Sequence, residues 1–216
     1  MKHAYIFDFD GTLVDSMPCW SEKMLSILRT QGISYPPDII KRIAPLGDWG
    51  TAKYFREELG VLLSFEQMQT QMDAFALPKY RDEILLKPGV KEFLEAAKAQ
   101  GIALYVLTAS PHKMADPCLK RNGVWELFDR VWTSEDFGLT KSQVQIYTEA
   151  LKLTGTQATD TVFFDDNLTA VETAAKAGLY TVGVYDPTGE DFACQMKAAA
   201  DRYIYGFAEL HAELPL

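Results

Sequence analysis

Residues 4–12 read AYIFDFDGT, an apolar stretch that runs directly into two aspartates, a glycine and a threonine. Ala4–Phe7 is short and continuously apolar, which is typical of a strand buried on both faces in a parallel sheet. Side chains two apart on an extended chain point the same way, so Asp8 and Asp10 would face the crevice at the strand's carboxyl end. Gly11 permits a sharp turn after them. Such a pair can bind a hard cation or act as nucleophile and acid/base, and a solvated acidic turn is the alternative.

Apolar runs of the same kind recur along the chain, and helical patterns separate them. The further predicted strands are Ile102–Leu107, Arg130–Trp132, Thr161–Phe164 and Tyr180–Tyr185. Helices are predicted between Pro88 and Gly101, over Ser142–Leu153, and from Leu168 to Gly178. Strands that alternate with helices indicate βαβ units, so we expect an α/β fold with an open, doubly wound parallel sheet.

Residues 15–86 interrupt this alternation. Helical stripes are found at Trp20, Met24, Ile27 and Leu28, and near 51–59 and 65–77, without a strong strand signal. The simplest account is a helical insertion after the first strand. We therefore expect two domains, a sheet core of residues 1–14 and 87–216 and a helical domain of residues 15–86.

Composition excludes several classes of protein. The 216 residues carry 30 Asp and Glu against 21 Lys and Arg, a net charge of −9 that disfavours binding to nucleic acid. The three cysteines are scattered, which indicates neither a zinc site nor a disulfide framework. The longest apolar run has six residues, too few to span a membrane, and aspartates break the apolar N-terminal stretch. We expect a cytoplasmic protein, with a monomer as the default.

A second acidic pair ends another predicted strand. Phe163 and Phe164 lead into Asp165, Asp166 and Asn167, of which Asn167 could cap the following helix. Together with Asp8 and Asp10, four carboxylates would then meet at the carboxyl ends of two parallel strands. Their mutual repulsion requires a cation, and a ligand set of oxygens alone favours Mg²⁺.

Two further segments suit a phosphate group. The strand ending in Thr108, Ala109 and Ser110 offers hydroxyls and free backbone N–H groups, although Ser110 could instead be a helix N-cap. Lys141 stands at the predicted start of a helix, where a cation is unfavourable unless an anion accompanies it. A solvated lysine is the alternative.

The order of these elements resembles the haloacid dehalogenase superfamily, in its phosphatase and β-phosphoglucomutase-like branch with a helical cap. The resemblance covers the whole chain. It implies a Rossmann-like core and a Mg²⁺-dependent phosphatase that hydrolyses a small-molecule phosphate ester through an aspartyl-phosphate. The matching motifs are DFDGTLVDS at 8–16, LTAS at 107–110, SEDFGLTKS at 134–142 and FFDDNLTAVETAAKAG at 163–178.

The resemblance also implies roles for single residues. Asp8 matches the nucleophile and Asp10 the general acid/base. Thr108 matches the phosphate-binding hydroxyl, with the backbone N–H of Ala109 beside it, and Lys141 matches the cation that neutralises nucleophile and phosphate. Ala109 stands where relatives often have Asn, so a side-chain contact is lost. The implied metal ligands are Asp8, the backbone carbonyl of Asp10, Asp165 and Asp166.

The helical domain would be the cap that closes over the site. Trp20 and Trp49 are candidates to contact substrate, and packing inside the cap is the alternative for each. A sugar phosphomutase would carry its cap histidine at Trp20 and its cap arginine near Trp49, so hydrolysis is favoured. A phosphonate hydrolase would need a buried cap lysine, and nothing in the pattern marks one among Lys23, Lys41 and Lys53. A non-catalytic binding protein is disfavoured because the four central site residues are intact, namely Asp8, Asp10, Lys141 and Asp166.

Overall fold

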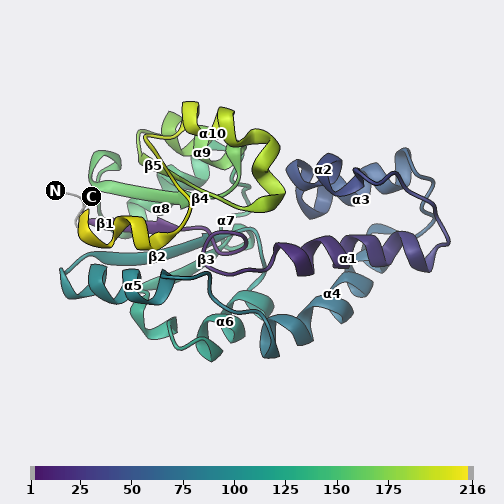
Figure 1. The fold of residues 1–216 in the computed structure, drawn as a ribbon, viewed down its shortest axis with the longest axis horizontal. Coiled ribbons are helices and arrows are strands. Elements are labelled where there is room, and N and C mark those ends of the chain that lie inside the picture. Colours follow the sequence, from purple (N-terminus) through teal and green to yellow (C-terminus); the bar gives the residue numbers. More distant parts are fainter. Residues whose placement is uncertain (1–2, 214–216) are drawn as a thin grey trace.

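The computed structural model describes residues 3–213, and its core is one six-stranded sheet (Figure 1). The strand order is β3-β2-β1-β4-β5-β6, and every strand pairs with its neighbours in parallel. The order extends outward from β1 in both directions, as in a doubly wound sheet, so the expected α/β class with a Rossmann-like core is confirmed. The strands are β1 (Ala4–Phe7), β2 (Ala103–Thr108), β3 (Arg130–Thr133), β4 (Thr161–Asp165), β5 (Tyr180–Val184) and β6 (Arg202–Ile204).

The register of β1 positions the residues that follow the central strands. Phe7 pairs with Val106 of β2 on one side and with Phe164 of β4 on the other. Because the three strands run in the same direction, their carboxyl ends meet at one edge of the sheet. The chain therefore brings Asp8 to the same edge as the ends of β2 and β4.

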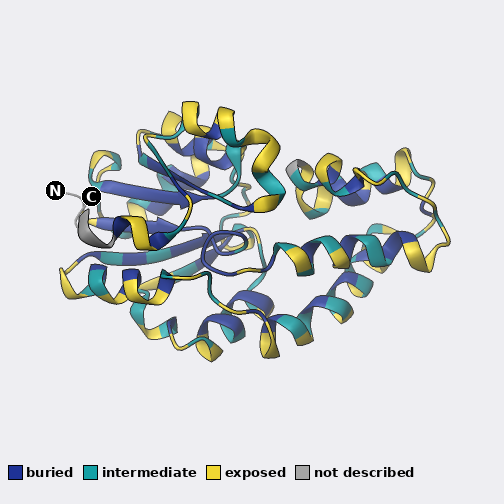
Figure 2. Ribbon diagram, viewed as in Figure 1, coloured by how far each residue is buried: buried dark blue, intermediate teal, exposed yellow. Residues whose placement is uncertain are grey.

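Helices cover both faces of the sheet because its strands are apolar on both sides (Figures 1 and 2). Tyr5 and Phe7 pack into one core cluster, and Ile6 packs into the cluster on the opposite face. Phe7 stacks on Phe164 with ring centroids 4.6 Å apart. The helices on the first face are α5 (Val90–Ala99), α6 (His112–Arg121) and the 3-10 segment η5 (Phe207–Glu213), and those on the second are α8 (Val144–Thr154), α9 (Leu168–Lys176) and α10 (Ala193–Ala199).

The helical insertion extends away from the carboxyl edge of the sheet and has an apolar cluster of its own (Figure 1). The chain leaves and returns where Val14 and Leu86 form an antiparallel bridge. This bridge supports the division into residues 1–14, 15–86 and 87–216, which stays a prediction. The elements of the insertion are α1 (Met17–Thr30), α2 (Ile39–Ile43), the 3-10 turn η1 (Ala44–Leu46), α3 (Gly47–Glu57) and α4 (Phe65–Asp82).

Some elements differ from the expectation. Helix α4 continues to Asp82 rather than ending near 77, and α3 begins at Gly47 rather than near 51. The elements that were not expected are α2, α6, α10, β6 and the short helix α7 (Ser134–Phe137), with the 3-10 segments η1, η2 (Trp125–Leu127), η3 (Ala158–Asp160), η4 (Pro187–Phe192) and η5. Over residues 3–213, no helix combines the length and apolarity needed to cross a bilayer.

Candidate active site

Lys141 and two carboxylates form the centre of the site. The Lys141 Nζ lies 2.5 Å from Oδ1 of Asp8 and 2.7 Å from Oδ2 of Asp165. The segment between α7 and α8 carries Lys141, and the Tyr147 hydroxyl holds it by donating to the Lys141 carbonyl at 2.9 Å. The same hydroxyl is also placed 3.0 Å from the carbonyl of Ala170 in α9. Lys141 is thus bound to carboxylates rather than solvated, and Tyr147 is a supporting residue that the sequence analysis missed.

Burial and the closeness of like charges shift the pKa values of the carboxylates and of Lys141 at this site. Burial, with the neighbouring Asp165 and Asp10 carboxylates, raises the pKa of Asp8 to about 7, although Lys141 acts in the opposite direction. Burial also raises the pKa of Asp165, and burial and the nearby carboxylates raise that of Asp166 well above its ordinary value. Burial disfavours the Lys141 ammonium, but Asp165 and Asp8 outweigh it and raise the pKa of Lys141. The Lys141 ammonium pairs with only two of these three carboxylates, Asp8 and Asp165, so negative charge is in excess.

This surplus of negative charge fits a divalent cation. Asp8, Asp165 and Asp166 each offer an oxygen, and these oxygens all lie within 4.8 Å of one another. The backbone N–H of Asp166 donates to the Thr12 hydroxyl at 3.0 Å, which holds the end of β4 against the loop that follows β1. An all-oxygen set with excess negative charge suits Mg²⁺. The Asp10 side chain is not in this cluster, so the structure brings together three of the four carboxylates that were expected to meet. A ligand role for the Asp10 backbone carbonyl stays a prediction.

The Asp10 carboxylate is instead held by three hydroxyl groups. Ser16, just before α1, donates to its Oδ1 at 2.6 Å, and Tyr80 of α4 donates to the same oxygen at 2.5 Å. Ser110 donates to Oδ2 at 2.5 Å. Ser110 is not the N-cap of α6, since that position belongs to Pro111. Asp10 therefore connects the core with the helical insertion, a link that local sequence patterns did not indicate.

Thr108 and Ala109 lie at the end of β2, on the same edge as Asp8. Thr108 is buried, and its hydroxyl accepts the backbone N–H of Ser110 at 3.0 Å, which orients it. Ala109 is exposed. Their contact with a phosphate group stays a prediction.

Comparison with known proteins identifies the family. Residues 5–184 match the haloacid dehalogenase-like hydrolases. The chain belongs to this family. It is 27% identical over 176 residues to the phosphorylated carbohydrates phosphatase of Thermotoga maritima, covering 82% of each chain. It is 30% identical over 224 residues to the ribulose-1,5-bisphosphate 5-phosphatase of Halopiger xanaduensis, covering 94% of this chain and 93% of the relative. The crystal structure of CbbY from Rhodobacter sphaeroides with phosphate shares its fold, with a TM-score of 0.82 at 23% identity over 97% and 96% of the two chains. The predicted membership of the phosphatase branch is confirmed.

The two candidate tryptophans of the insertion have different surroundings. Trp20 is buried in the apolar cluster of the insertion, and its indole N–H donates to Oδ1 of Asp48 at 2.8 Å. Trp49 is 65% exposed and packs edge-on against Phe65. The packing alternative therefore describes Trp20, whereas Trp49 is free to meet a ligand. Contact of either with substrate stays a prediction.

Lys23 is buried in the same part of the hydrolase, which the sequence analysis did not foresee. Only 5% of its side chain is exposed, and its Nζ lies 2.7 Å from Oδ2 of Asp48. The signal was present, because Lys23 continues the inward stripe of Trp20, Met24 and Ile27 at helical spacing. The Asp48 carboxylate compensates the positive charge of this buried lysine.

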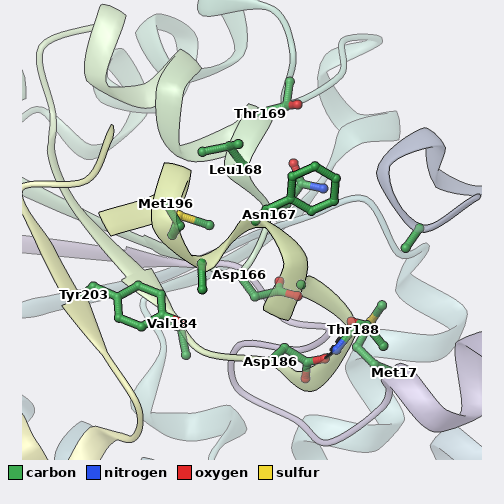
Figure 3. Close-up of a pocket in the computed structure, with 14 residues that line it drawn as sticks. Met17, Asp166, Asn167, Leu168, Thr169, Val184, Asp186, Thr188, Met196 and Tyr203 are labelled. Carbon is green, nitrogen blue, oxygen red and sulfur yellow. Dashed lines mark hydrogen bonds between the residues drawn. The ribbon is translucent and has the colours of Figure 1, made fainter. Parts of the chain in front are cut away.

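A cavity of about 110 Å³ opens beside Asp166, between the core of the hydrolase and its insertion (Figure 3). Asp186 points to it from the end of β5, where its Oδ1 accepts the Thr188 hydroxyl at 2.6 Å. The Lys87 Nζ lies 2.9 Å from the other Asp186 oxygen and also donates to the carbonyl of Gly11. The other lining residues are Met17, Ala44, Asn167, Leu168, Thr169, Val184, Gly189, Phe192, Ala193, Met196 and Tyr203.

Proposed function

We propose that the protein is a Mg²⁺-dependent phosphatase that hydrolyses a small-molecule phosphate monoester through an aspartyl-phosphate on Asp8. The observation that carries this proposal is the Lys141 bridge between Asp8 and Asp165, with Asp166 near enough to complete an oxygen cluster. A nucleophilic carboxylate, a fixed cation and a metal-ligand set then lie together at one sheet edge. The phosphatase relatives support the same chemistry.

In the first step, a carboxylate oxygen of Asp8 attacks phosphorus, and the bond from phosphorus to the leaving oxygen breaks. Lys141 offsets the repulsion between this carboxylate and the anionic ester. The Thr108 hydroxyl and the backbone N–H groups after β2, including that of Ala109, meet charge on the phosphoryl oxygens. Mg²⁺ would be held by Asp8, Asp165, Asp166 and the Asp10 backbone carbonyl, and it supplies Lewis-acid stabilisation of the phosphoryl charge when bound.

Asp10 handles the proton in both halves of the reaction. It donates a proton to the leaving oxygen in the first step, and it accepts one from the water that cleaves the acyl phosphate in the second. General acid–base assistance of this kind contributes about 10²–10⁴-fold. Residues 15–86 act as the cap that excludes bulk water, and Trp20 and Trp49 are its candidate substrate contacts.

The test is a phosphate-release assay with Mg²⁺ on a panel of sugar phosphates, nucleotides and phosphoglycolate. Asp8→Asn should lower activity by about 10⁴-fold or more, which is the scale of nucleophile loss in other hydrolases. Asp82→Asn, which changes an exposed carboxylate paired with Arg81, is the matched control and should be active. Activity that survives in Asp8→Asn would contradict the nucleophile assignment.

Two other outcomes would favour the alternatives. Interconversion of sugar phosphate isomers without release of phosphate would indicate a phosphomutase. Binding without turnover on any ester would indicate a non-catalytic protein.

A further inference from the structure

The two oxygens of the Asp10 carboxylate have different surroundings. Oδ1 accepts two hydrogen bonds, from the hydroxyls of Ser16 at 2.6 Å and Tyr80 at 2.5 Å. Oδ2 accepts one, from Ser110 at 2.5 Å. When Asp10 takes up a proton while both hydroxyls keep donating to Oδ1, the proton must be carried by Oδ2, where the single Ser110 contact can give way or reverse.

The donors on Oδ1 are held more firmly than the donor on Oδ2. Ser16 is fully buried, and Tyr80 is 2% exposed with its ring 6.0 Å from that of Phe9. A phenol with the ordinary tyrosine pKa of about 10 is already a donor at neutral pH, and burial and the Asp10 carboxylate raise the pKa of Tyr80 further. Ser110 is only half-buried and follows β2 in the loop before α6. A leaving group can therefore displace Ser110 more easily than either donor on Oδ1.

We propose that Tyr80, with Ser16, is a positioning residue that fixes Oδ1 of Asp10 and thereby assigns proton transfer to Oδ2. This inference rests on the proposed function. As the bond between phosphorus and the leaving oxygen breaks and that to Asp8 forms, the proton on Oδ2 passes to the leaving oxygen. In the second step water bonds to phosphorus, the bond to Asp8 breaks, and the water proton passes to Oδ2. Because α4 carries Tyr80, the orientation of the Asp10 carboxyl group depends on a helix of the insertion.

The experiment compares two leaving groups in Tyr80→Phe, which keeps the ring and removes the hydroxyl. An alkyl phosphate such as a hexitol monophosphate needs a proton on its leaving oxygen, whereas p-nitrophenolate leaves without one. We measure kcat/KM, which reports the steps up to phosphoryl transfer. Since acid catalysis contributes about 10²–10⁴-fold, a misplaced acid should lower the alkyl value by about tenfold or more and the p-nitrophenyl value by less than about threefold. An equal loss on both substrates would overturn the inference.

Three companion variants make the result decisive. Ser16→Ala removes the other donor from the same oxygen and should repeat the selective loss, and an equal loss there would count against the proposal as well. Tyr54→Phe, which removes a half-buried hydroxyl of the insertion that is not one of the three on Asp10, should leave both values unchanged. Asp10→Ala defines the full selective loss. If Asp10→Ala itself affects both substrates equally, the acid role in the proposed function fails along with the inference. If Asp10→Ala is selective but Tyr80→Phe and Ser16→Ala lose activity equally on both substrates, only the positioning role fails.

Discussion

Gly11 shows at the scale of one residue how closely the loop after β1 approaches the candidate metal site. Its φ of +73° lies in the left-handed region that L side chains rarely adopt. A Cβ at this position would lie 2.8 Å from Cγ of Asp166, too close for any real contact. Two separate constraints, backbone conformation and proximity to a metal-ligand candidate, therefore require glycine here.

Gly11→Ala tests these two constraints against a matched control. Gly138 has a φ of +62° with nothing within 4 Å of its added Cβ, so Gly138→Ala should destabilise the fold by only about 1–2 kcal/mol. Gly11→Ala should lower the free energy of unfolding further, because the Asp166 carboxylate must move, and it should weaken the response to Mg²⁺. Denaturant unfolding with and without Mg²⁺ measures both effects. Equal losses in the two variants would contradict the steric argument.

At the scale of elements, His112 connects α6 with α7. It is the first residue of α6, and its Nδ1 lies 2.8 Å from Oδ1 of Asp116 one turn later. Its Nε2 lies 3.0 Å from Oδ2 of Asp136 in α7, the same oxygen that accepts the backbone N–H of Thr133. The hydrogen bond with Asp116, aided by that with Asp136, raises the pKa of His112 above 6.5.

This link should make stability depend on pH in one direction. A raised pKa in the folded state means that the contribution of His112 is fully present below about pH 6.5 and is lost as pH rises through the folded value. His112→Gln should therefore lower Tm relative to the unmodified protein more at pH 6 than at pH 9. Asp116→Asn should show the same trend, since it removes the main cause of the shift. Thermal melts across this range are the measurement, and a difference that grows with pH would refute the pairing.

At the scale of the whole molecule, the net charge of −9 is unevenly distributed. Asp8, Asp165 and Asp166 lie close together, where Lys141 pairs with Asp8 and Asp165 and the charge of Lys87 acts on Asp166. Folding therefore concentrates negative charge that the unfolded chain keeps apart. A cation that binds only the folded arrangement stabilises it.

Mg²⁺ should accordingly raise the Tm of the protein, and chelation should lower it. At a free concentration 100 times the Kd, the gain in unfolding free energy is about 2.7 kcal/mol. Asp166→Ala should reduce the shift, whereas Asp82→Asn, on the exposed end of α4, should keep it. A melting curve that millimolar Mg²⁺ leaves unchanged would count against a cation at this cluster.

Sequence patterns predicted elements wherever an apolar period was long and uninterrupted. β1, β4 and α9 lie where expected, because buried strands and an amphipathic helix have strong local signals. β6 was missed because three residues are too few to show a period. Helix α6 carries buried Met114, Ala115, Cys118 and Leu119, but Pro117 inside it obscured a usable pattern.

The sequence alone determined the α/β class and brought Asp8, Asp165 and Asp166 to one edge of the sheet, because residues that end neighbouring parallel strands meet there. Lys141 ends no strand, and only the family resemblance assigned it to the same site. The tertiary structure decided which groups hold Asp10, since Tyr80 lies 70 residues away in an inserted helix. It also decided that Lys23 is buried against Asp48. Local periodicity defines which face of a helix is apolar, but only the packing of separate helices decides which polar groups meet across that face.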